Sequence, residues 1–386
     1  INTGNDGICP SSDQRGIFSP QRTHCDIVAY AYDAPVHISI YYVKPVASGV
    51  GDCLSWTNAC TLQTALANAI SGSELWVMAG TYKPTTSVDR NASFHLKSGV
   101  AVYGGFAGVE TMRDQRNPAI SVTILSGEIG AVGNSDNSYH VVIGAGHATL
   151  DGFTVTAGNA NGSSFSTNLG GGMYNQSSSP ILTNVIFSNN QADYGAGMVN
   201  SSNSNPVLTN VTFSDNLATI LCGGMHNSGN SPILINVVFS GNSATESGGG
   251  MCNYSSSPTL TNVTFNNNTA EYNNGGGMYN TDSNPTLTNV TFSDNVANKG
   301  GGMYNNFSSS PLLTNITFSG NFANSGGGMY NNGSNPTLTN VTFNNNLAPD
   351  YGWGGGMVND FSSPTLMNVT FYNNSAPSGG GMGNYS

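Results

Sequence analysis

The chain has 386 residues, of which 50 are glycine and only 8% are charged, and its formal net charge at pH 7 is −11. This much glycine without a strict triplet period excludes a collagen, and the regular apolar pattern excludes a disordered chain. The acidic balance argues against nucleic acid and anionic membranes as partners, and we expect no membrane insertion because no run of 18 apolar residues occurs.

Residues 1–36 differ from the rest of the chain. They contain Ile1-Asn2-Thr3-Gly4, Asp13-Gln14-Arg15-Gly16 and Cys25-Asp26-Ile27. These motifs resemble the segment that closes β-helices at their C-terminal end in proteins with a choice-of-anchor domain, although Val28 stands where glycine is usual. Because this segment precedes the repeats and begins in mid-motif, we expect a processed or partial chain. The segment is a piece of a tandem β-helix protein, a joint that docks on a neighbouring copy, or a simple appendage.

Residues 37–160 predict an N-terminal cap followed by irregular coils. The apolar spacing of residues 61–70 is that of an amphipathic helix, with Thr61 as N-cap and Gly72 as stop. Such a helix would cover the unpaired strand edges of the first coil. The sequences TLQTALANA, ELWVMAGTYKP and LKSGVAVYGGFAG resemble the N-terminal coils of secreted bacterial β-helix proteins. Strands are predicted at residues 37–43, 75–79, 92–106, 122–125 and 139–155, and a surface salt-bridge cluster at Glu110, Arg113, Asp114 and Arg116.

Residues 161–386 repeat one unit of about 26 residues eight times and begin a ninth. A representative copy, at residues 275–298, reads GGGMYNTDSNPTLTNVTFSDNVAN. The Met after the glycines recurs at positions 173, 198, 225, 251, 278, 303, 329, 357 and 382. The apolar residues alternate, as they do in strands, and show no 3.6-residue period that would indicate paired helices.

The spacing of apolar residues within one unit requires corners. Leu287 and Phe292 are five residues apart and would face opposite sides of a straight strand. Both are large and apolar, so the chain must bend between them, at Asn289. A second bend is predicted at Asn295, and the glycine run begins a third strand that ends at Asn305. Three short strands per unit predict an all-β fold, a parallel β-helix whose coils stack about 4.8 Å apart.

The paired motifs GG-x-Met and Phe-x-x-Asn resemble the repeat of chlamydial polymorphic outer-membrane proteins and related bacterial right-handed parallel β-helix proteins. The family pattern is GGA plus an apolar residue, whereas here the third position is usually Gly and the apolar residue is always Met. The resemblance covers the whole repeat region and implies a right-handed β-helix. It is a poor guide to function, because the fold hosts adhesins, lyases and plain spacers.

Stacked coils would align identical residues in columns, with apolar residues inside and Asn at the corners. An Asn amide that bonds to the Asn one coil away satisfies polar groups that the turns would leave unpaired. The Asn of the recurring Asn-Val-Thr is expected at an inward corner, where a glycan would not fit. The three expected columns contain Asn184, Asn210, Asn262 and Asn289; Asn190, Asn216, Asn268 and Asn295; and Asn175, Asn200, Asn280 and Asn305.

Six cysteines bear on the location of the protein. Two pairs flank short loops and are predicted to be disulfides: Cys9 with Cys25, and Cys53 with Cys60. These bonds would indicate an oxidising, extracellular or cell-surface location. Cys222 and Cys252 fall in adjacent coils but four positions out of register, about 13 Å along a strand, and a disulfide needs Cα atoms within about 7 Å. We therefore expect Cys222 and Cys252 to be separate thiols.

The tyrosine that follows Met in several coils is predicted to face outward, and the column is interrupted by Val199, His226, Cys252 and Val358. One interpretation is an aromatic ladder that stabilises the stacked strands. The other is a surface strip that binds carbohydrate or a partner. The residues of this strip are Tyr174, Tyr279, Tyr304 and Tyr330.

Few residues on this scaffold point to catalysis. Lys299 is the single basic residue after position 117, whereas lyases that act on uronates need a Lys or Arg base and usually calcium. Glu246 and Glu271 are the best acid pair for a hydrolase, but both fall in a variable loop that is expected to be a solvated turn. His140 and His147 lack a third partner. The prediction is a protein that is not an enzyme and that has no cofactor or metal.

The leading functional hypothesis is structural. The last coil has no polar cap, helix or charged edge, although terminal repeats normally need capping. We expect residues 1–36 of one subunit to cover the open end of the next, a heterologous contact that gives open filaments. The protein would then be an extracellular subunit of a filament or surface fibre whose partner is itself. A cell-surface adhesin or carbohydrate-binding spacer, with surface polysaccharide as partner, is the alternative, and a polysaccharide-active enzyme is a distant third.

Overall fold

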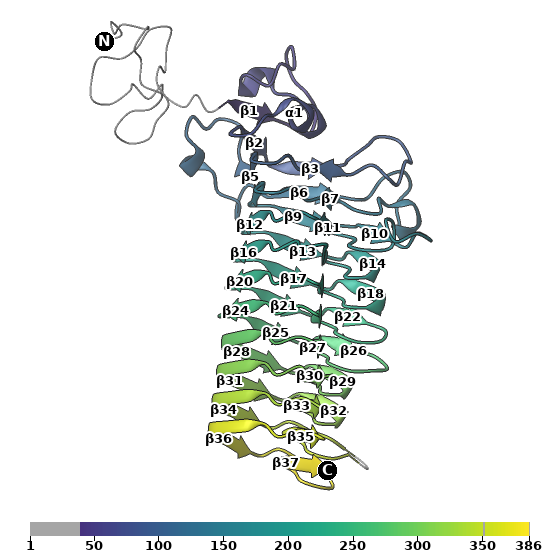
Figure 1. The fold of residues 1–386 in the computed structure, drawn as a ribbon. Coiled ribbons are helices and arrows are strands. Elements are labelled where there is room, and N and C mark those ends of the chain that lie inside the picture. The colour runs from purple at the N-terminus through teal and green to yellow at the C-terminus, as the bar shows by residue number, and fades with distance from the viewer. Residues whose placement is uncertain (1–38, 350–351, 386) are drawn as a thin grey trace, which may run out of the picture. The chain divides into compact units, whose positions relative to one another are not determined.

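The computed structural model describes residues 39–349 and 352–385. The chain divides into two units, Ile1–Ser39 and Ile40–Ser386, and the described residues belong almost wholly to the second. This second unit is a stack of parallel coils that runs from β1 (Ile40–Val43) to β37 (Met382–Tyr385) (Figure 1). Within the described ranges, no helix is long and apolar enough to cross a membrane.

One coil of the repeat contains three strand segments, as the sequence predicts. In the coil that begins at Met278, β27 (Met278–Thr281) leads through a turn into β28 (Thr286–Ser293), which is followed by β29 (Val296–Lys299). Asp294, between β28 and β29, has a φ of 54° and makes the second corner. Three segments joined by left-handed corner residues return the chain to its starting direction, one strand spacing further along the axis.

The corner predicted at Asn289 lies within β28. Asn289 has a φ of 55°, a left-handed conformation that Asn adopts more readily than most residues. The bend allows Leu287 and Phe292, which a straight strand would point to opposite sides, both to face inward with 0% exposure. The same left-handed residue recurs in each repeat coil at Asn184, Asn210, Asn236, Asn262, Asn289, Asn315, Asn340 and Asn368.

Glycine precedes each Met because the chain arches tightly at that point. Gly275 has a φ of 70°, and a Cβ there would lie 2.5 Å from the carbonyl oxygen of Met278 and 3.0 Å from the Cα of Tyr279. The next glycine, Gly276, faces the following coil, where a Cβ would lie 2.5 Å from the carbonyl oxygen of Val296. These close approaches explain why the repeat keeps two or three glycines in a row.

Equivalent strands of successive coils pair in parallel and in register, for example Met278 with Met303 and Phe292 with Phe318. Within residues 39–349 and 352–385 these strands form three sheets. The 19-stranded sheet contains β1 (Ile40–Val43), β2 (Glu74–Met78), β3 (Gly80–Tyr82), β5 (Ala101–Phe106), β6 (Thr123–Ser126), β8 (Thr149–Asp151), β9 (Thr154–Thr156), β12 (Ile181–Thr183), β13 (Ile186–Ser188), β16 (Val207–Thr209), β17 (Thr212–Ser214), β20 (Ile233–Ile235), β21 (Val238–Ser240), β24 (Thr259–Thr261), β25 (Thr264–Asn266), β28, β31 (Leu312–Ser319), β34 (Thr337–Asn344) and β36 (Thr365–Tyr372).

The other two sheets complete the wall of the solenoid. The 11-stranded sheet contains β4 (Phe94–His95), β7 (Val142–Ile143), β11 (Met173–Gln176), β15 (Met198–Ser201), β19 (Met225–Ser228), β23 (Met251–Tyr254), β27, β30 (Met303–Asn306), β33 (Met329–Asn332), β35 (Met357–Asp360) and β37 in the described part of the chain. The 7-stranded sheet, counted over the same residues, contains β10 (Asn159–Ala160), β14 (Gln191–Tyr194), β18 (Leu217–Leu221), β22 (Ser243–Ala244), β26 (Thr269–Ala270), β29 and β32 (Phe322–Ser325).

The core consists of columns of identical side chains. The phenylalanine rings of neighbouring coils stack with centroids 4.7 to 5.0 Å apart, from Phe187 to Phe371. A fully buried Phe contributes roughly 1.5–3 kcal/mol of hydrophobic stabilisation, so the column is a major part of the stability of each coil. Columns of Leu, Val and Met line the same interior, and small alanines such as Ala218 fill the narrow corner beside the 7-stranded sheet.

Helix α1 (Leu62–Asn68) covers the N-terminal end of the solenoid. The Thr61 side chain accepts a hydrogen bond from the Thr64 backbone N–H at 3.2 Å and caps the helix, as predicted. The buried face of α1 packs on β1, β2 and β4, and Gly72, with a φ of 88°, lies in the turn before β2. Short 3₁₀ helices lie in the irregular coils at η2 (Trp56–Asn58), η3 (Arg113–Gln115) and η4 (Asn134–Asp136).

The predicted fold is confirmed. The described part of the chain is an all-β parallel solenoid of about 26 residues per coil with one short α-helix. The predicted strand at 92–106 is divided into β4 and β5, and the one at 139–155 into β7, β8 and part of β9, because each predicted run includes a corner of the coil. Residues 1–36, with the predicted Cys9–Cys25 pair, lie outside the described residues.

Candidate functional site

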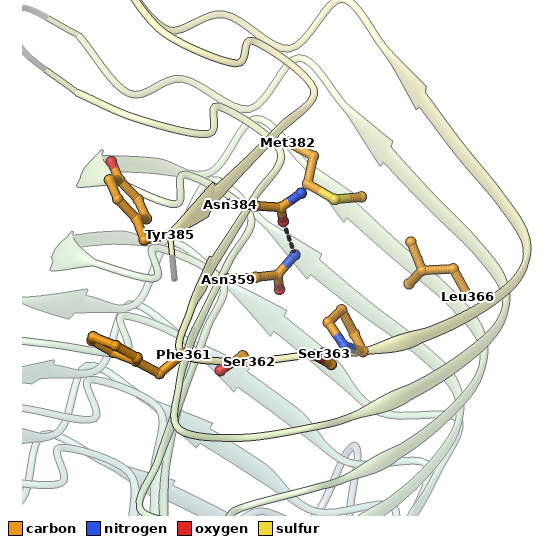
Figure 2. Close-up of a pocket in the computed structure, with 9 residues that line it drawn as sticks. Asn359, Phe361, Ser362, Ser363, Leu366, Met382, Asn384 and Tyr385 are labelled. Atoms are coloured by element: carbon orange, nitrogen blue, oxygen red, sulfur yellow. Dashed lines mark hydrogen bonds between the residues drawn. The ribbon is translucent and has the colours of Figure 1, made fainter.

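The C-terminal end of the described solenoid is an open coil. In β36, Leu366 is 37% exposed, whereas its partner in the preceding coil, Leu338, is 0% exposed. Phe371 and Met382 are only partly buried, although the same columns are fully buried in the earlier repeat coils. A hollow of about 680 Å³ lies over this end, between the turn at residues 361–364 and the side chain of Met382 (Figure 2). In each preceding coil the equivalent apolar side chains are covered by the next coil, whereas at this end they are uncovered.

Two asparagine amides at this end lack the partner that their columns normally provide. In the two inner columns each Asn Nδ2 donates to the Oδ1 of the Asn one coil further on, as Asn359 does to Asn384 at 2.8 Å (Figure 2). Within residues 39–349 and 352–385, the Nδ2 of Asn384 has no acceptor, and that of Asn374 donates only to the Phe343 carbonyl oxygen at 2.8 Å. A further coil with Asn at these positions would extend both columns.

Two of the three predicted asparagine columns are buried ladders. Their members that were singled out from the sequence are 0% exposed: Asn175, Asn200, Asn280 and Asn305, and Asn190, Asn216, Asn268 and Asn295. Asn268 shows the pattern, because its Nδ2 donates to the Phe239 carbonyl oxygen at 2.9 Å and to Asn295 Oδ1 at 3.0 Å. Its Oδ1 accepts the backbone N–H of Asn242 at 3.1 Å and the side-chain amide of Asn242 at 2.9 Å. The ladder thus pairs the polar groups of the turn.

The third column lies on the outside, and the expectation of an inward corner is wrong. Asn184, Asn210, Asn262 and Asn289 are exposed, because the left-handed bend that directs the flanking Leu and Val inward directs the Asn side chain outward. Their amides still form a ladder, in which Asn289 Nδ2 donates to Asn262 Oδ1 at 3.1 Å. The argument against a glycan on Asn-Val-Thr therefore fails.

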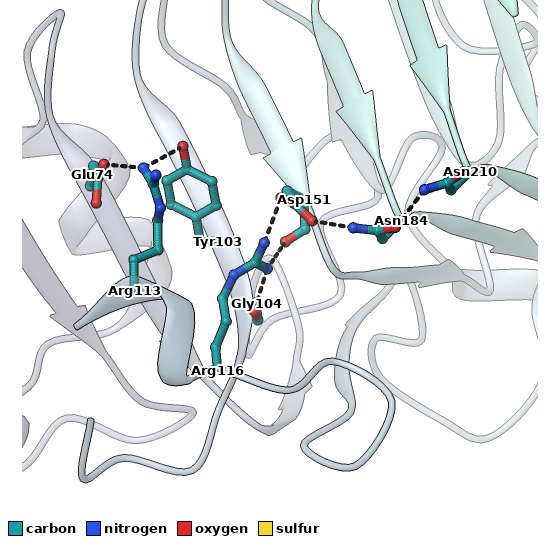
Figure 3. A network of polar contacts seen from close by, with 8 residues as sticks. All are labelled: Glu74, Tyr103, Gly104, Arg113, Arg116, Asp151, Asn184 and Asn210. Atoms are coloured by element: carbon teal, nitrogen blue, oxygen red, sulfur yellow. Dashed lines mark hydrogen bonds and ion pairs between the residues drawn. The ribbon is translucent and has the colours of Figure 1, made fainter. Parts of the chain in front are cut away.

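The outer ladder ends on an ion pair in the irregular coils (Figure 3). Asn184 Nδ2 donates to the Asp151 carboxylate at 3.0 Å, and Asp151 is paired with Arg116. Arg113 pairs with Glu74 at 2.7 Å and donates to the Tyr103 hydroxyl at 3.2 Å. The predicted cluster is therefore wrong in its pairing, because Arg113 in η3 and Arg116, directly after it, reach to β2 and β8.

The two acids of that loop behave differently from each other. Glu110 is buried, and its carboxylate accepts the backbone N–H groups of Ala107 at 2.6 Å, Gly108 at 2.9 Å and Val109 at 3.0 Å. Burial alone would raise the pKa of Glu110, but these backbone donors together lower it. Asp114 is exposed. Glu110 thus closes its own loop and takes no part in an ion-pair cluster.

The tyrosine column is a partly buried stack, which agrees with the interpretation of an aromatic ladder and leaves little of Tyr304 and Tyr330 for a surface strip. Tyr304 and Tyr330 are each 5% exposed, and the rings of Tyr279, Tyr304 and Tyr330 stack with centroids 5.6 and 5.3 Å apart. The glycine arch of each coil folds against the residue after Met, which is why the column is shielded. Tyr174, at the other end of the column, remains half-buried.

Four described cysteines form two disulfides. Cys53 and Cys60 are bonded, as their spacing predicts. Cys222 and Cys252 are also bonded, with Cα atoms 5.4 Å apart, so the expectation of separate thiols is wrong. That expectation assumed a straight strand, but the arch brings the first-glycine position over the residue after Met. At Gly248, which matches Cys222 in the next coil, a Cβ would clash with Cys252 Sγ.

The candidate acids and histidines do not converge. Glu246, Glu271 and His147 are exposed. His140 is buried, with its ring nitrogens 3.0 and 2.8 Å from the carbonyl oxygens of Gly170 and Ser166. Burial lowers the pKa of His140, although the hydrogen bonds to backbone oppose this. Over residues 39–349 and 352–385, no group of three or more His, Cys, Asp or Glu side chains is placed to hold a metal ion.

A second hollow, which we name the lateral groove, lies on the outer face of the 11-stranded sheet. It spans β11, β15 and β19 and has a volume of about 390 Å³. Val199 and His226 interrupt the tyrosine column in the sequence and lie in this groove. Phe165 and Tyr194 line it from outside the repeat pattern, so the sequence analysis missed them. The groove is lined by Phe165, Leu169, Tyr174, Gln176, Tyr194, Val199, Ser201, Ser202, His226 and Ser228.

Comparisons with known proteins concern the fold. A family described as "Right handed beta helix region" matches residues 259–385. No curated protein sequence matches the chain. A solved structure of pectate lyase Pel9A is similar at 14% identity, with 89% of this chain and 80% of that chain covered and a TM-score of 0.49. A rhamnogalacturonan lyase is similar at 12% identity, with 87% of each chain covered and a TM-score of 0.30.

The prediction that the chain is not an enzyme was drawn from its amino-acid composition, and it is wrong. The pectate lyase and the rhamnogalacturonan lyase named above are both polysaccharide lyases. The scarcity of basic residues concerned only the repeats, whereas Arg90, Arg113 and Arg116 lie in the irregular coils. At identities this low the likeness shows the fold alone, and it assigns no reaction, substrate or catalytic residue to this chain.

Proposed function

We propose that the protein is an extracellular structural subunit that joins end to end with copies of itself in a filament or surface fibre. The observation that carries the proposal is the open coil at β36 and β37. Leu366 is 37% exposed there, while the leucines of the same column in the preceding repeat coils are 0% exposed. An uncovered coil end is a template for a further strand.

The chemistry of the open end favours another β-helix coil as its occupant. A stacked coil would cover Leu366 and Phe371 with the apolar columns that cover their equivalents. It would also offer acceptors to Asn374 and Asn384 at the spacing of the ladder. Residues 1–36, which resemble the closing segment of β-helices, are the part of a neighbouring copy that we expect to provide it. Such a contact joins two different surfaces, so it extends indefinitely.

The disulfides support the proposed location. Cys53–Cys60 and Cys222–Cys252 are two covalent bonds that persist in oxidising compartments and are rare in reducing ones. A cell-surface spacer that binds carbohydrate is a second candidate function, and the lateral groove is the observation that favours it. The two functions are compatible, because the groove lies on the side of the solenoid and the open coil at its end.

The test is the association state of the full-length chain, measured by light scattering over a range of concentrations. The double variant Leu366→Lys/Phe371→Lys places one charge in the hollow and a second on the partly buried end of the Phe column, and it should abolish association that the parent chain shows. The matched control, Thr365→Lys/Thr370→Lys, places the same charges at exposed positions on the same strand and should associate like the parent. A parent chain that stays monomeric at every concentration, or a double variant that associates normally, would contradict the proposal.

A further inference from the structure

We propose that the lateral groove is a binding site for a neutral oligosaccharide. This inference is independent of end-to-end assembly, because none of the groove residues belongs to the open coil. It rests on the aromatic walls of the groove, on a half-buried histidine whose shielded Nδ1 has no partner among the described residues, and on the absence of charged side chains from the lining residues.

The walls of the groove are aromatic, and one of them is held out into solvent. Phe165 is 79% exposed, yet its loop is fixed on both sides. Thr167 donates its backbone N–H to the Ser164 carbonyl oxygen at 2.9 Å, and the Ser166 carbonyl oxygen lies 2.8 Å from His140 Nε2. A sugar ring has an apolar face of C–H groups that packs on aromatic rings, so a fixed, exposed Phe beside Tyr194 suits such a ligand.

The floor of the groove contains a polar atom that no protein group satisfies. Within residues 39–349 and 352–385, His226 Nδ1 is shielded from solvent and has no hydrogen-bond partner. The His226 ring packs edge-on against Tyr254, with centroids 5.4 Å apart, and lies 6.4 Å from the Tyr194 ring. A buried polar atom left unpaired is costly, and a ligand hydroxyl would remove that cost. Ser201 and Ser228 place further hydroxyls along the same edge.

The electrostatics of the groove favour an uncharged ligand. None of its lining residues is Lys, Arg, Asp or Glu, and burial lowers the pKa of His226 to about 4, so the ring is neutral at pH 7. Lys299, the single basic residue of the repeats, lies over the Tyr330 ring at 4.9 Å, several coils away. A uronate carboxylate would therefore enter the groove without a cation to pair with, which disfavours it.

The experiment is titration calorimetry of the full-length protein with neutral hexasaccharides of β-linked glucose, xylose, mannose and galactose, and with hexagalacturonate as the anionic probe. We expect at least one neutral probe to bind and hexagalacturonate to bind more weakly. Phe165→Ala should weaken neutral binding about tenfold, the equivalent of ~1.4 kcal/mol, and His226→Gln should weaken it as well. Phe307→Ala removes another exposed ring, which is 65% exposed and lies outside the groove, and should leave binding unchanged.

Three results would overturn the proposal. They are the absence of binding by every neutral probe, tighter binding of hexagalacturonate, and neutral binding that Phe165→Ala does not weaken. Because Phe165 is exposed, its truncation should leave the melting temperature unchanged, and this measurement separates lost binding from lost folding. Failure of end-to-end association would leave these outcomes unaffected.

Discussion

The irregular coils at residues 40–160 and the repeat coils from Met173 onward satisfy buried polar groups by different means. In the irregular coils long side chains reach across turns of unequal length, as when Arg90 donates to the carbonyl oxygens of Asn137 at 2.7 Å and Asn159 at 2.8 Å. In the repeats one short side chain, Asn, does this in every coil. Because the repeat coils have a fixed period, a ladder of neutral Asn side chains can satisfy their turns. The irregular coils differ in length, so their turns require long, charged side chains.

The two regions meet at Asp151. Asp151 pairs in register with Thr183 of the next coil, its carboxylate accepts the side-chain amide of Asn184, and its charge is paired with Arg116. Of the ion pairs that the structure shows within residues 39–349 and 352–385, both lie in the irregular coils. Four predictions separate the contributions of the two regions, beginning with the largest effect.

Asn268→Ala should destabilise the repeat region by at least about 3 kcal/mol. The change removes the acceptor of the Asn242 backbone N–H, one of the two acceptors of the Asn242 side-chain amide and the side-chain donor to the Phe239 carbonyl oxygen, and each unpaired buried group costs about 1–3 kcal/mol. Thermal unfolding followed by circular dichroism measures the effect. Asn262→Ala, in the exposed ladder of the same coil, is the matched control and should cost roughly 0.5 kcal/mol. Equal losses in the two variants would refute the distinction between inner and outer ladders.

Arg116→Leu should destabilise the irregular coils by about 2–3 kcal/mol. It leaves the Asp151 carboxylate, whose side chain is only 12% exposed, without its cation. The double variant Arg116→Leu/Asp151→Asn should recover much of this loss, because an amide oxygen at position 151 can still accept the Asn184 side-chain amide while no unpaired charge remains. Hydrogen exchange of β8 and β9 in the three proteins measures the effect. A double variant as unstable as Arg116→Leu would show that the ion pair has a role other than charge compensation.

The repeat region should lose stability as the pH falls from 6.5 towards about 4. Burial lowers the folded-state pKa of His226 to about 4, so the unfolded chain binds a proton in this window and the folded chain does not. Between pH 7 and pH 5 the loss is roughly 2 kcal/mol. Melting temperatures of the parent and of His226→Gln should therefore converge as the pH falls. A difference that stays constant with pH would contradict the assignment.

Glu110→Gln should cost at least about 1 kcal/mol at pH 7, because the three backbone N–H groups use both carboxylate oxygens and an amide has only one, so at least one N–H loses its acceptor. The folded-state pKa of Glu110 is lowered. Its contribution is therefore complete above the ordinary carboxyl pKa of 4.5 and is lost as the pH falls through the folded-state pKa. Acid unfolding curves of the parent and the variant should merge only below pH 4.5, a lower window than that of His226.

The repeat could be predicted well because its spacing encodes its geometry. The corner at Asn289 followed from Leu287 and Phe292 alone, and the buried ladder of Asn268 followed from its recurrence. The path of the chain through the glycines could not be predicted, because an arch moves residues close together that are far apart along a strand. That path explains both the Cys222–Cys252 bond and the burial of Tyr304.

The lateral groove could not be predicted from the sequence, for a related reason. Phe165 lies in a loop without a periodic signal, and only the folded chain brings it beside His226. The pairing of Arg113 and Arg116 was missed because their partners, Glu74 and Asp151, are 39 and 35 residues away. Periodic patterns predict contacts between equivalent residues, whereas contacts between different elements require the structure.

Electron microscopy of the native, full-length protein tests end-to-end assembly most directly. Twelve coils, counted along the strands that pair in register from β1 to β36 in the described residues, span roughly 55 Å at about 4.8 Å per coil. The proposal predicts continuous fibres with an axial repeat near this length, and their disruption by Leu366→Lys/Phe371→Lys. Isolated rods of one subunit length at high protein concentration would contradict it.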